Sequence, residues 1–238
     1  MTERTDELFR DDSYLRSCDA CVVEVNDRGG IILDRTVFYY TGGGQPGDTG
    51  TLSWDGGAVR IGTTIQIEGD IIHVPEEGQA LPTAGTRVRA EIDWDRRHRL
   101  MRMHTSMHLL CSIVPCGVTG GQVGEEKSRL DFDVGDHSLD KEALTEELNR
   151  LVTEDHPLET MWITDAELDQ NPELVRTMSV QPPRNAGRVR LVKIGDAVDL
   201  QPCGGTHIAR TGEIGRLRVG KIENKGARNR RVNIHLEG

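Results

Sequence analysis

The chain has 238 residues, with 39 acidic against 29 basic side chains and a net charge of −10. This length allows one large domain or two ordinary ones with a buried core. No apolar run is long enough to span a membrane, the charged start is not a signal peptide, and five cysteines without a dense framework indicate reduced thiols with no disulfide partner. We therefore expect a cytoplasmic protein, and the acidic charge taken alone argues against binding to nucleic acid.

The first 90 residues alternate short β-rich stretches with turns that contain Gly and Asp. The expected strands lie at 20–25, 31–33, 36–40, 58–67 and 71–74. Many short strands at this spacing favour a small antiparallel β-barrel. A loop-like segment follows at 76–86, and the pattern predicts a domain boundary that gives domains 1–92 and 93–238.

The period of the apolar residues then becomes helical. Over 95–114, one helix face carries Leu100, Met103, Met107, Leu110 and Val114. The proline at position 115 ends this helix.

The remainder mixes one more helix with strands. A helix is expected over 139–153, with Ser138 as its N-cap. Strands are expected at 160–164 and 188–194, and a hairpin around 224–226 closes the chain. The second domain is therefore expected to be α+β, with helices packed on an antiparallel sheet.

Two short motifs carry side chains that bind metals. His104 and His108 are four residues apart on the expected helix, so both imidazoles lie on one face. Thr105 stands where the helical zinc-protease motif has a glutamate, which excludes that mechanism. Cys203 and His207 flank two glycines that allow both side chains to face one point. Three imidazoles and one thiol suit a single tetrahedral Zn²⁺ per chain.

Each motif also has a simpler interpretation. Histidines at this spacing occur by chance in many helices, and a cysteine such as Cys203 is more often a small buried hydrophobe. Cys111 is a rival ligand because it follows His108 by three residues, whereas Cys18 and Cys21 form only an isolated C-x-x-C. The two motifs together, with complementary donors, favour a metal site.

A glycine-rich segment occupies residues 41–50. It lacks the Gly-Lys-Ser/Thr ending of a phosphate-binding P-loop. It is either a long hairpin loop or a backbone that approaches a ligand, with Gln45, Asp48 or Thr49 as polar contacts. The residues alone leave both possibilities open.

Basic residues gather beside both metal motifs, whereas residues 136–169 are mostly acidic. Because salt limits the reach of distant charges to about 10 Å, a local basic surface on an acidic protein can still bind phosphates.

The two metal motifs resemble the paired HxxxH and CxxxH motifs of alanyl-tRNA synthetase editing domains and of the free-standing AlaX editing proteins. The editing domain of threonyl-tRNA synthetase shares this ligand pattern. Segments 36–50, 129–133 and 211–215 are also similar to motifs of the family. The length resembles that of its medium-sized members.

The resemblance implies a trans-editing hydrolase that cleaves Ser-tRNA(Ala), and also Gly-tRNA(Ala), while sparing Ala-tRNA(Ala). It implies that zinc is held by His104, His108, Cys203 and His207, and that the N-terminal barrel is similar to those of translation factors. We expect the aminoacyl group to contact Gly43, Gly44, Gln45, Asp48 and Thr206. We expect the tRNA to contact Arg97, Arg102, Lys221, Lys225, Arg228 and Arg230.

The chemistry of discrimination agrees with this function. Serine exceeds alanine by one hydroxyl, which an apolar pocket rejects poorly, so a second hydrolytic site is needed. A pocket that pairs the hydroxyl can prefer serine, because burying it unpaired costs about 1–3 kcal/mol. Zinc can position the ester or activate water, although four protein ligands are also typical of structural zinc. The alternatives are a deacylase for another tRNA, such as Ser-tRNA(Thr), a hydrolase of small esters, or a non-catalytic tRNA-binding module with structural zinc.

Overall fold

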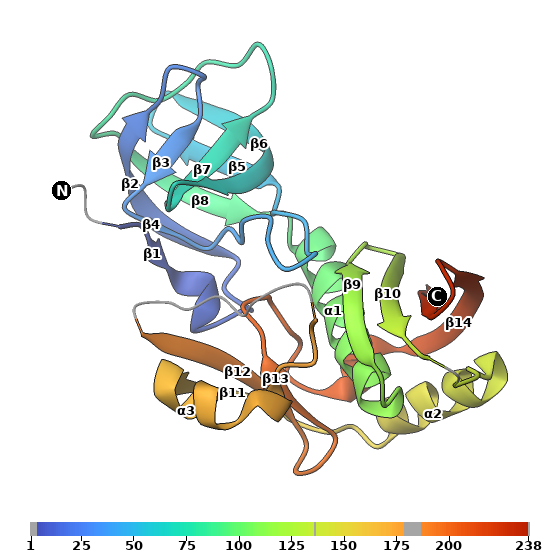
Figure 1. Ribbon diagram of the computed structural model, residues 1–238. Helices are drawn as coiled ribbons and strands as arrows, with labels where there is room; N and C mark the ends of the chain where they lie inside the picture. The colour runs from blue at the N-terminus through green and yellow to red at the C-terminus, as the bar shows by residue number, and fades with distance from the viewer. Residues whose placement is uncertain (1–3, 136, 179–186, 238) are drawn as a thin grey trace. The chain divides into compact units, whose positions relative to one another are not determined.

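The computed structural model describes residues 4–135, 137–178 and 187–237. Its contacts divide the chain into two compact units, Met1–His98 and Arg99–Gly238, which are described separately (Figure 1). The division falls inside helix α1 (Trp94–Ile113). The boundary expected after residue 92 stays a prediction.

A closed barrel of antiparallel strands forms most of the first unit. Around the barrel the strands are β2 (Ser17–Val25), β3 (Ile31–Leu33), β7 (Asp70–Pro75), β6 (Gly57–Ile67), β5 (Gly50–Trp54) and β8 (Arg87–Ile92). The short strands β1 (Asp6–Glu7) and β4 (Arg35–Thr36) form a separate parallel pair, and a 3-10 turn, η1, follows at Leu8–Arg10.

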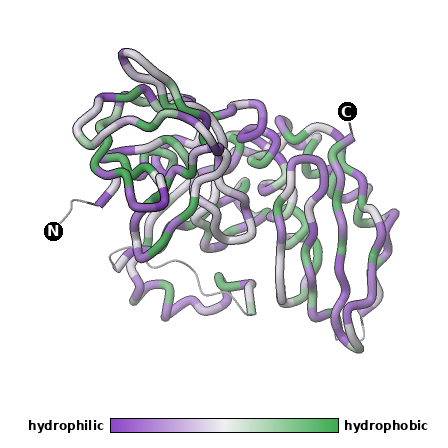
Figure 2. The backbone as a smooth tube through the Cα atoms, turned by 90° about the horizontal axis from the view of Figure 1, so that it is seen from above, coloured by the Kyte–Doolittle hydropathy of each residue, from purple (hydrophilic) through white to green (hydrophobic). Residues whose placement is uncertain are grey.

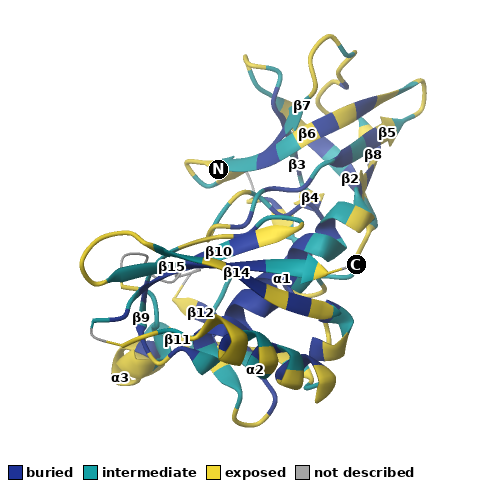
Figure 3. Cartoon of the chain, turned by 90° about the vertical axis from the view of Figure 1, so that its right-hand side faces the viewer, coloured by how far each residue is buried: buried dark blue, intermediate teal, exposed yellow. Residues whose placement is uncertain are grey.

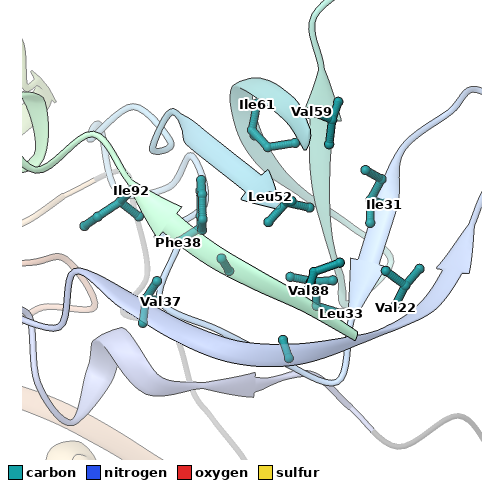
Figure 4. Close-up of a cluster of buried hydrophobic side chains, with 12 residues drawn as sticks. Val22, Ile31, Leu33, Val37, Phe38, Leu52, Val59, Ile61, Val88 and Ile92 are labelled. Carbon is teal, nitrogen blue, oxygen red and sulfur yellow. The ribbon is translucent and has the colours of Figure 1, made fainter. Parts of the chain in front are cut away.

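Alternating residues of the barrel strands fill its interior. Figure 4 shows Val22, Leu52, Val59 and Ile61 pointing into this core, and each is almost completely buried. Alternation arises because successive side chains of a strand point to opposite faces. One face of each strand thus forms the barrel interior.

The strand expected at 36–40 is wrong beyond Thr36. The Thr36 hydroxyl accepts a hydrogen bond from the amide of Phe38 at 3.0 Å, and this local bond turns the chain out of strand geometry. Val37 and Phe38 are nonetheless fully buried in the barrel core. Their apolar, β-branched and aromatic character indicated burial correctly but not the backbone conformation.

The second unit contains two antiparallel sheets. The larger has the strand order β14 (Arg216–Asn224), β15 (Asn229–Glu237), β10 (Lys127–Asp133) and β9 (Gly117–Gln122). The smaller has the order β11 (Leu158–Thr164), β12 (Arg188–Ile194) and β13 (Asp199–Pro202). Because helices accompany these antiparallel sheets, the chain belongs to the α+β class.

Helices and short 3-10 turns accompany the sheets. Helix α2 (Lys141–Thr153) buries one apolar stripe and contacts β14. Its N-cap is Asp140, whose carboxylate accepts from the Ala143 amide, so the cap expected at Ser138 is wrong. Helix α3 (Asp165–Gln170) and the turn η2 (Pro172–Leu174) follow β11, and η3 (Thr211–Ile214) precedes β14.

Helix α1 lies close to the larger sheet because position 121 has no side chain. A β-carbon at Gly121 would lie 2.9 Å from the Leu130 side chain and 3.1 Å from the terminal methyl of Met107. Glycine therefore permits this close packing of α1 on β9 and β10. Figure 3 shows that much of α1 is buried, and its predicted apolar face is buried throughout.

Hydrophobic and hydrophilic residues are interleaved along the chain (Figure 2). In the described ranges, the helices are too short or too polar to span a bilayer.

Candidate metal centre

Four potential metal ligands converge in the second unit. His104 and His108 come from successive turns of α1, and Cys203 and His207 come from the loop that follows β13. One ligand atom from each residue lies within 4.8 Å of the others. The structure therefore brings together all four residues that the two sequence motifs singled out. The rival Cys111 is buried but is not part of this group.

The loop that carries Cys203 is fixed by the neighbouring strand. The Cys203 amide donates to the carbonyl of Arg190, which continues the β12–β13 ladder by one more bond. The Arg190 guanidinium then donates to the carbonyls of Cys203 at 3.0 Å and Gly205 at 2.9 Å. These bonds turn the chain so that Cys203 and His207 face α1.

The donor atoms are close enough to share one ion. The Cys203 sulfur lies 3.3 Å from Nε2 of His207 and 3.6 Å from Nε2 of His104. The rings of His104 and His207 have centroids 4.3 Å apart, and those of His108 and His207 are 4.7 Å apart. All three histidines are less than 8 % exposed, so bulk water has little access to the imidazoles, whereas Cys203 is partly exposed.

Two of the histidines are oriented by further polar side chains. Nδ1 of His108 donates to a carboxylate oxygen of Asp199 at 2.8 Å, and the same oxygen accepts from the Gln201 amide at 2.8 Å. Nδ1 of His207 lies 3.1 Å from the hydroxyl of Thr105. Both contacts leave Nε2 free to face the cluster, which is the arrangement that orients metal-binding histidines.

The sequence did not single out Asp199 or Gln201, and it indicated Arg190 only as one of several basic residues before Cys203. A signal was present, because Asp199 and Gln201 alternate with spacing two just before Cys203, as residues on one face of a strand do. Their role depends on how β12 pairs with β13, which local patterns do not reveal.

The cluster shifts the protonation of its members. Burial raises the pKa of the Cys203 thiol, but His104, His108 and His207 outweigh burial and hold that pKa well below its usual range. Burial lowers the pKa of His108, whereas its hydrogen bonds to Asp199 and Cys203 raise it to about 10. Burial and the charge of His104 lower the pKa of His207 to about 3. A thiolate is thus favoured, and a bound metal would take the place of the proton that offsets its charge.

Two of the expected contact residues are instead engaged with each other in the first unit. Arg97 and Asp48 are 0 % and 1 % exposed and form a two-point ion pair, with Nε of Arg97 at 3.0 Å from both carboxylate oxygens. The guanidinium also donates to the carbonyls of Ser13 and Val37, and the carboxylate accepts from the Tyr39 amide. The expected tRNA contact at Arg97 and the expected substrate contact at Asp48 are therefore wrong, because these two charged groups are buried and pair with each other inside this unit.

The glycine-rich segment begins with a tight hairpin turn. Gly42 and Gln45 exchange two backbone hydrogen bonds, and Gly43 and Gly44 have φ values of 57° and 83°. Positive φ at both central residues is the condition for a type I′ turn, which favours glycine. At Gly47, a β-carbon would lie 1.9 Å from the Thr64 carbonyl oxygen. Turn geometry and close packing thus account for these glycines, and the side chain of Gln45 is fully buried.

The remaining expected contact residues lie in the second unit. Thr206 is fully buried in the loop between Cys203 and His207. Arg102 is half-buried and donates to the Ile214 carbonyl at 2.8 Å. Lys221, Lys225 and Arg228 are exposed on β14 and the hairpin that follows it. Lys225 pairs with Glu223, Arg228 pairs with Asp133, and Arg230 donates to backbone carbonyls of its own turn.

Comparisons with known proteins agree with the site. Residues 189–233 match the family described as the threonyl and alanyl tRNA synthetase second additional domain, and residues 15–96 match tRNA synthetases class II (A). The chain is 38 % identical to an alanyl-tRNA editing protein AlaX-M of Methanosarcina acetivorans, over 98 % of this chain and 99 % of that protein. The chain belongs to the AlaX family of alanyl-tRNA editing proteins.

Larger proteins match the chain over part of their own length. An AlaX-L protein of Pyrococcus horikoshii is 33 % identical over 92 % of this chain and 54 % of its own length. The alanine–tRNA ligase of Pyrobaculum neutrophilum is 37 % identical over 92 % of this chain but only 25 % of the ligase. The match thus covers nearly all of the AlaX-M relative, about half of the AlaX-L relative and one quarter of the ligase.

Proposed function

We propose that the chain is a trans-editing deacylase, which hydrolyses the ester between tRNA(Ala) and a wrongly attached amino acid. The observation that carries this proposal is the convergence of His104, His108, Cys203 and His207 in a chain that matches an AlaX-M protein over nearly its whole length. Serine is the expected amino acid, and glycine is the second.

Zinc is the ion that the donor set fits. With usual Zn–N and Zn–S bond lengths, the sulfur–nitrogen edge of a tetrahedral site is about 3.6 Å, close to the sulfur–nitrogen distances of 3.6 and 3.3 Å. One thiolate with three imidazoles also matches zinc in ligand softness. Bound zinc would supply a Lewis acid that polarises the ester or lowers the pKa of a water molecule.

The chain's own residues supply orientation and a dry environment. Asp199 and Thr105 hold the rings of His108 and His207 in single orientations. The deep burial of the three imidazoles limits bulk water, which strengthens polar contacts to the ester. Thr206, Gly43, Gly44 and Gln45 remain proposed aminoacyl contacts, and the exposed or half-buried cations Arg102, Lys221, Lys225, Arg228 and Arg230 remain proposed tRNA contacts.

Two further aspects of the proposal rest on the sequence. The likeness of the N-terminal barrel to those of translation factors is one. The choice of tRNA(Ala) over tRNA(Thr) is the other, since the matching family of residues 189–233 includes threonyl as well as alanyl synthetases. The full-length match to an alanyl-tRNA editing protein favours the alanine system.

The test is a deacylation assay on the purified chain with Ser-tRNA(Ala), Gly-tRNA(Ala), Ala-tRNA(Ala) and Ser-tRNA(Thr), combined with metal analysis. We expect serine release from Ser-tRNA(Ala), no release of alanine, and about one zinc per chain. His104→Ala should lose the zinc and reduce the rate by about 100-fold or more, because removing an outer partner of a ligand alone costs 10–100-fold. His137→Ala, at an exposed histidine, is the matched control.

Each alternative gives a distinct result. Serine release no faster than the spontaneous reaction, with zinc bound, would support a non-catalytic tRNA-binding module. Faster release from Ser-tRNA(Thr) would move the specificity to threonine. Hydrolysis of small serine esters at the same rate as the tRNA substrate would show that the protein does not recognise the tRNA part of the substrate.

A further inference from the structure

The smaller sheet of the second unit has two different sides. One side carries Val189 and Leu191 of β12, which pack with Leu168 of α3 in an apolar cluster. The other side carries Arg190, which holds the metal-binding loop, together with Asp199, which orients His108. The sheet therefore turns one face towards a small core and the other towards the metal centre.

Trp162 lies on the side of the metal centre. It stands directly opposite Arg190 in the β11–β12 pair, and directly opposite residues of an antiparallel pair share a face with β-carbons about 5 Å apart. Arg190 in turn donates to the carbonyls of Cys203 and Gly205. One arginine side chain thus separates the position of Trp162 from the loop that carries Cys203 and His207.

Trp162 is also unusually exposed for its type. It is 39 % exposed, whereas the other tryptophans, Trp54 and Trp94, are half-buried. Its neighbours along the same face of β11 are uncharged and exposed, Thr160 and Thr164, and the exposed cation Arg188 lies opposite Thr164. A large aromatic surface beside a positive charge is the combination that binds nucleotides, through stacking of the base and attraction of the phosphate.

The proposed substrate has a base close to the ester bond that is cleaved. In an aminoacyl-tRNA, the ester joins the amino acid to the ribose of the 3′-terminal adenosine, so the adenine is one sugar away from the bond that breaks. When the ester lies at the metal centre, the adenine must rest on an adjoining surface. A tryptophan is suited to it, because stacking requires no base-specific hydrogen bonds.

We infer that Trp162 is a stacking platform for the terminal adenine of the tRNA, with Arg188 beside it for the adjoining phosphate. This inference rests on the proposed function and assigns a substrate-binding subsite to it. Because every tRNA ends in the same adenosine, the subsite contributes affinity and alignment of the ester, and it does not distinguish serine from alanine.

The experiment compares binding of uncharged tRNA(Ala) that ends in CCA with the same tRNA ending in CC, in the full chain and its variants. The unsubstituted chain should bind the CCA form more tightly. Trp162→Ala should lose about tenfold in affinity for the CCA form and little for the CC form, because only the CCA form has the stacked base. Trp162→Phe should restore most of the preference, since an aromatic face remains.

Met161→Ala is the matched control. Met161 is the adjacent residue, is 36 % exposed and points to the opposite side of the same strand. It should retain the full preference for CCA. Tryptophan fluorescence adds a direct observation. CCA-ended tRNA should quench the emission of Trp162, and CC-ended tRNA should not. Trp162→Phe lacks this tryptophan and should not show the quenching.

The outcomes separate this inference from the proposed function. An unchanged CCA preference in Trp162→Ala, with hydrolysis by the parent chain intact, would overturn the subsite and leave the deacylase standing. Equal losses in Trp162→Ala and Met161→Ala would also overturn it, by indicating a general effect on β11. No hydrolysis by the parent chain would instead overturn the proposed function.

Discussion

Each unit of the chain buries a cluster of ionisable groups, and the two clusters differ in where their polar atoms point. In the first unit, Arg97 and Asp48 pair with each other and form hydrogen bonds with nearby backbone groups. In the second unit, three imidazoles and a thiol turn their donor atoms toward one point. A cluster that satisfies itself holds a fold together, whereas a cluster whose donors converge is suited to binding an ion.

The largest effect is expected when the ion pair between Arg97 and Asp48 is broken. Arg97→Met should lower the free energy of unfolding of the barrel by about 3–5 kcal/mol, because it leaves the Asp48 carboxylate buried without its partner. Denaturant unfolding, with hydrogen exchange to locate the change in the first unit, measures this effect. The zinc content should stay unchanged, in contrast to His104→Ala.

The double variant Arg97→Met/Asp48→Asn provides the control. It should be less destabilised than the sum of the single variants, since neither charge is then left alone. Arg97→Met with normal stability but weaker tRNA binding would contradict the structural role and restore the tRNA contact expected from the sequence.

A smaller effect is expected where the metal centre depends on its supports. Asp199→Asn keeps an oxygen near Nδ1 of His108 but removes the charge, and it should weaken zinc binding by about 10–100-fold. Competition with a chromogenic chelator measures the change. Asp196→Asn alters a fully exposed acid that pairs with Lys193 just before β13 and should bind zinc normally. Equal zinc affinity in both variants would remove Asp199 from the centre.

An effect of similar size concerns a buried imidazole with ordinary partners. His73, inside the first unit, lies 3.0 Å from the Ile31 carbonyl and 2.8 Å from the Thr36 hydroxyl, and burial lowers its pKa to about 4. Because the unfolded chain binds the proton more readily, the contribution of His73 is fully present above about pH 6.5 and is lost as the pH falls towards 4.

Between pH 7 and pH 5 this loss should amount to about 2 kcal/mol. Hydrogen exchange of the barrel amides at the two pH values measures it. His73→Gln should be less stable at pH 7 but should show a flatter pH dependence. A pH dependence as steep as that of the parent would show that other groups are responsible.

The parts of this structure that the sequence predicted are those governed by local spacing. The i, i+4 pair of His104 and His108 and the loop of Cys203 and His207 each require only a few consecutive residues to define their geometry. Short β-rich stretches bounded by turn residues likewise identified most barrel strands. By contrast, the pairing of Asp48 with Arg97 and of His108 with Asp199 joins residues 49 and 91 positions apart. Such pairs follow from strand order and register, which local patterns do not encode.

Basic residues were the least informative signal. From the sequence we expected Arg97, Arg102 and Arg228 alike to contact tRNA, as cations near a metal motif. In the structure Arg97 is buried, Arg102 is half-buried, and Arg228 pairs with Asp133 on the surface. A charge in a sequence is available to a partner only if the fold leaves it there.

The glycine beneath α1 has a consequence for the metal centre. Gly121 is not one of the four clustered residues, yet its missing β-carbon lets Met107, one residue before His108, approach the sheet. An alanine at 121 would change no charge and no donor, but it would press on the helix segment that carries two of the four ligands. The positions of His104 and His108 thus also depend on the volume available behind the helix, on the side away from the cluster.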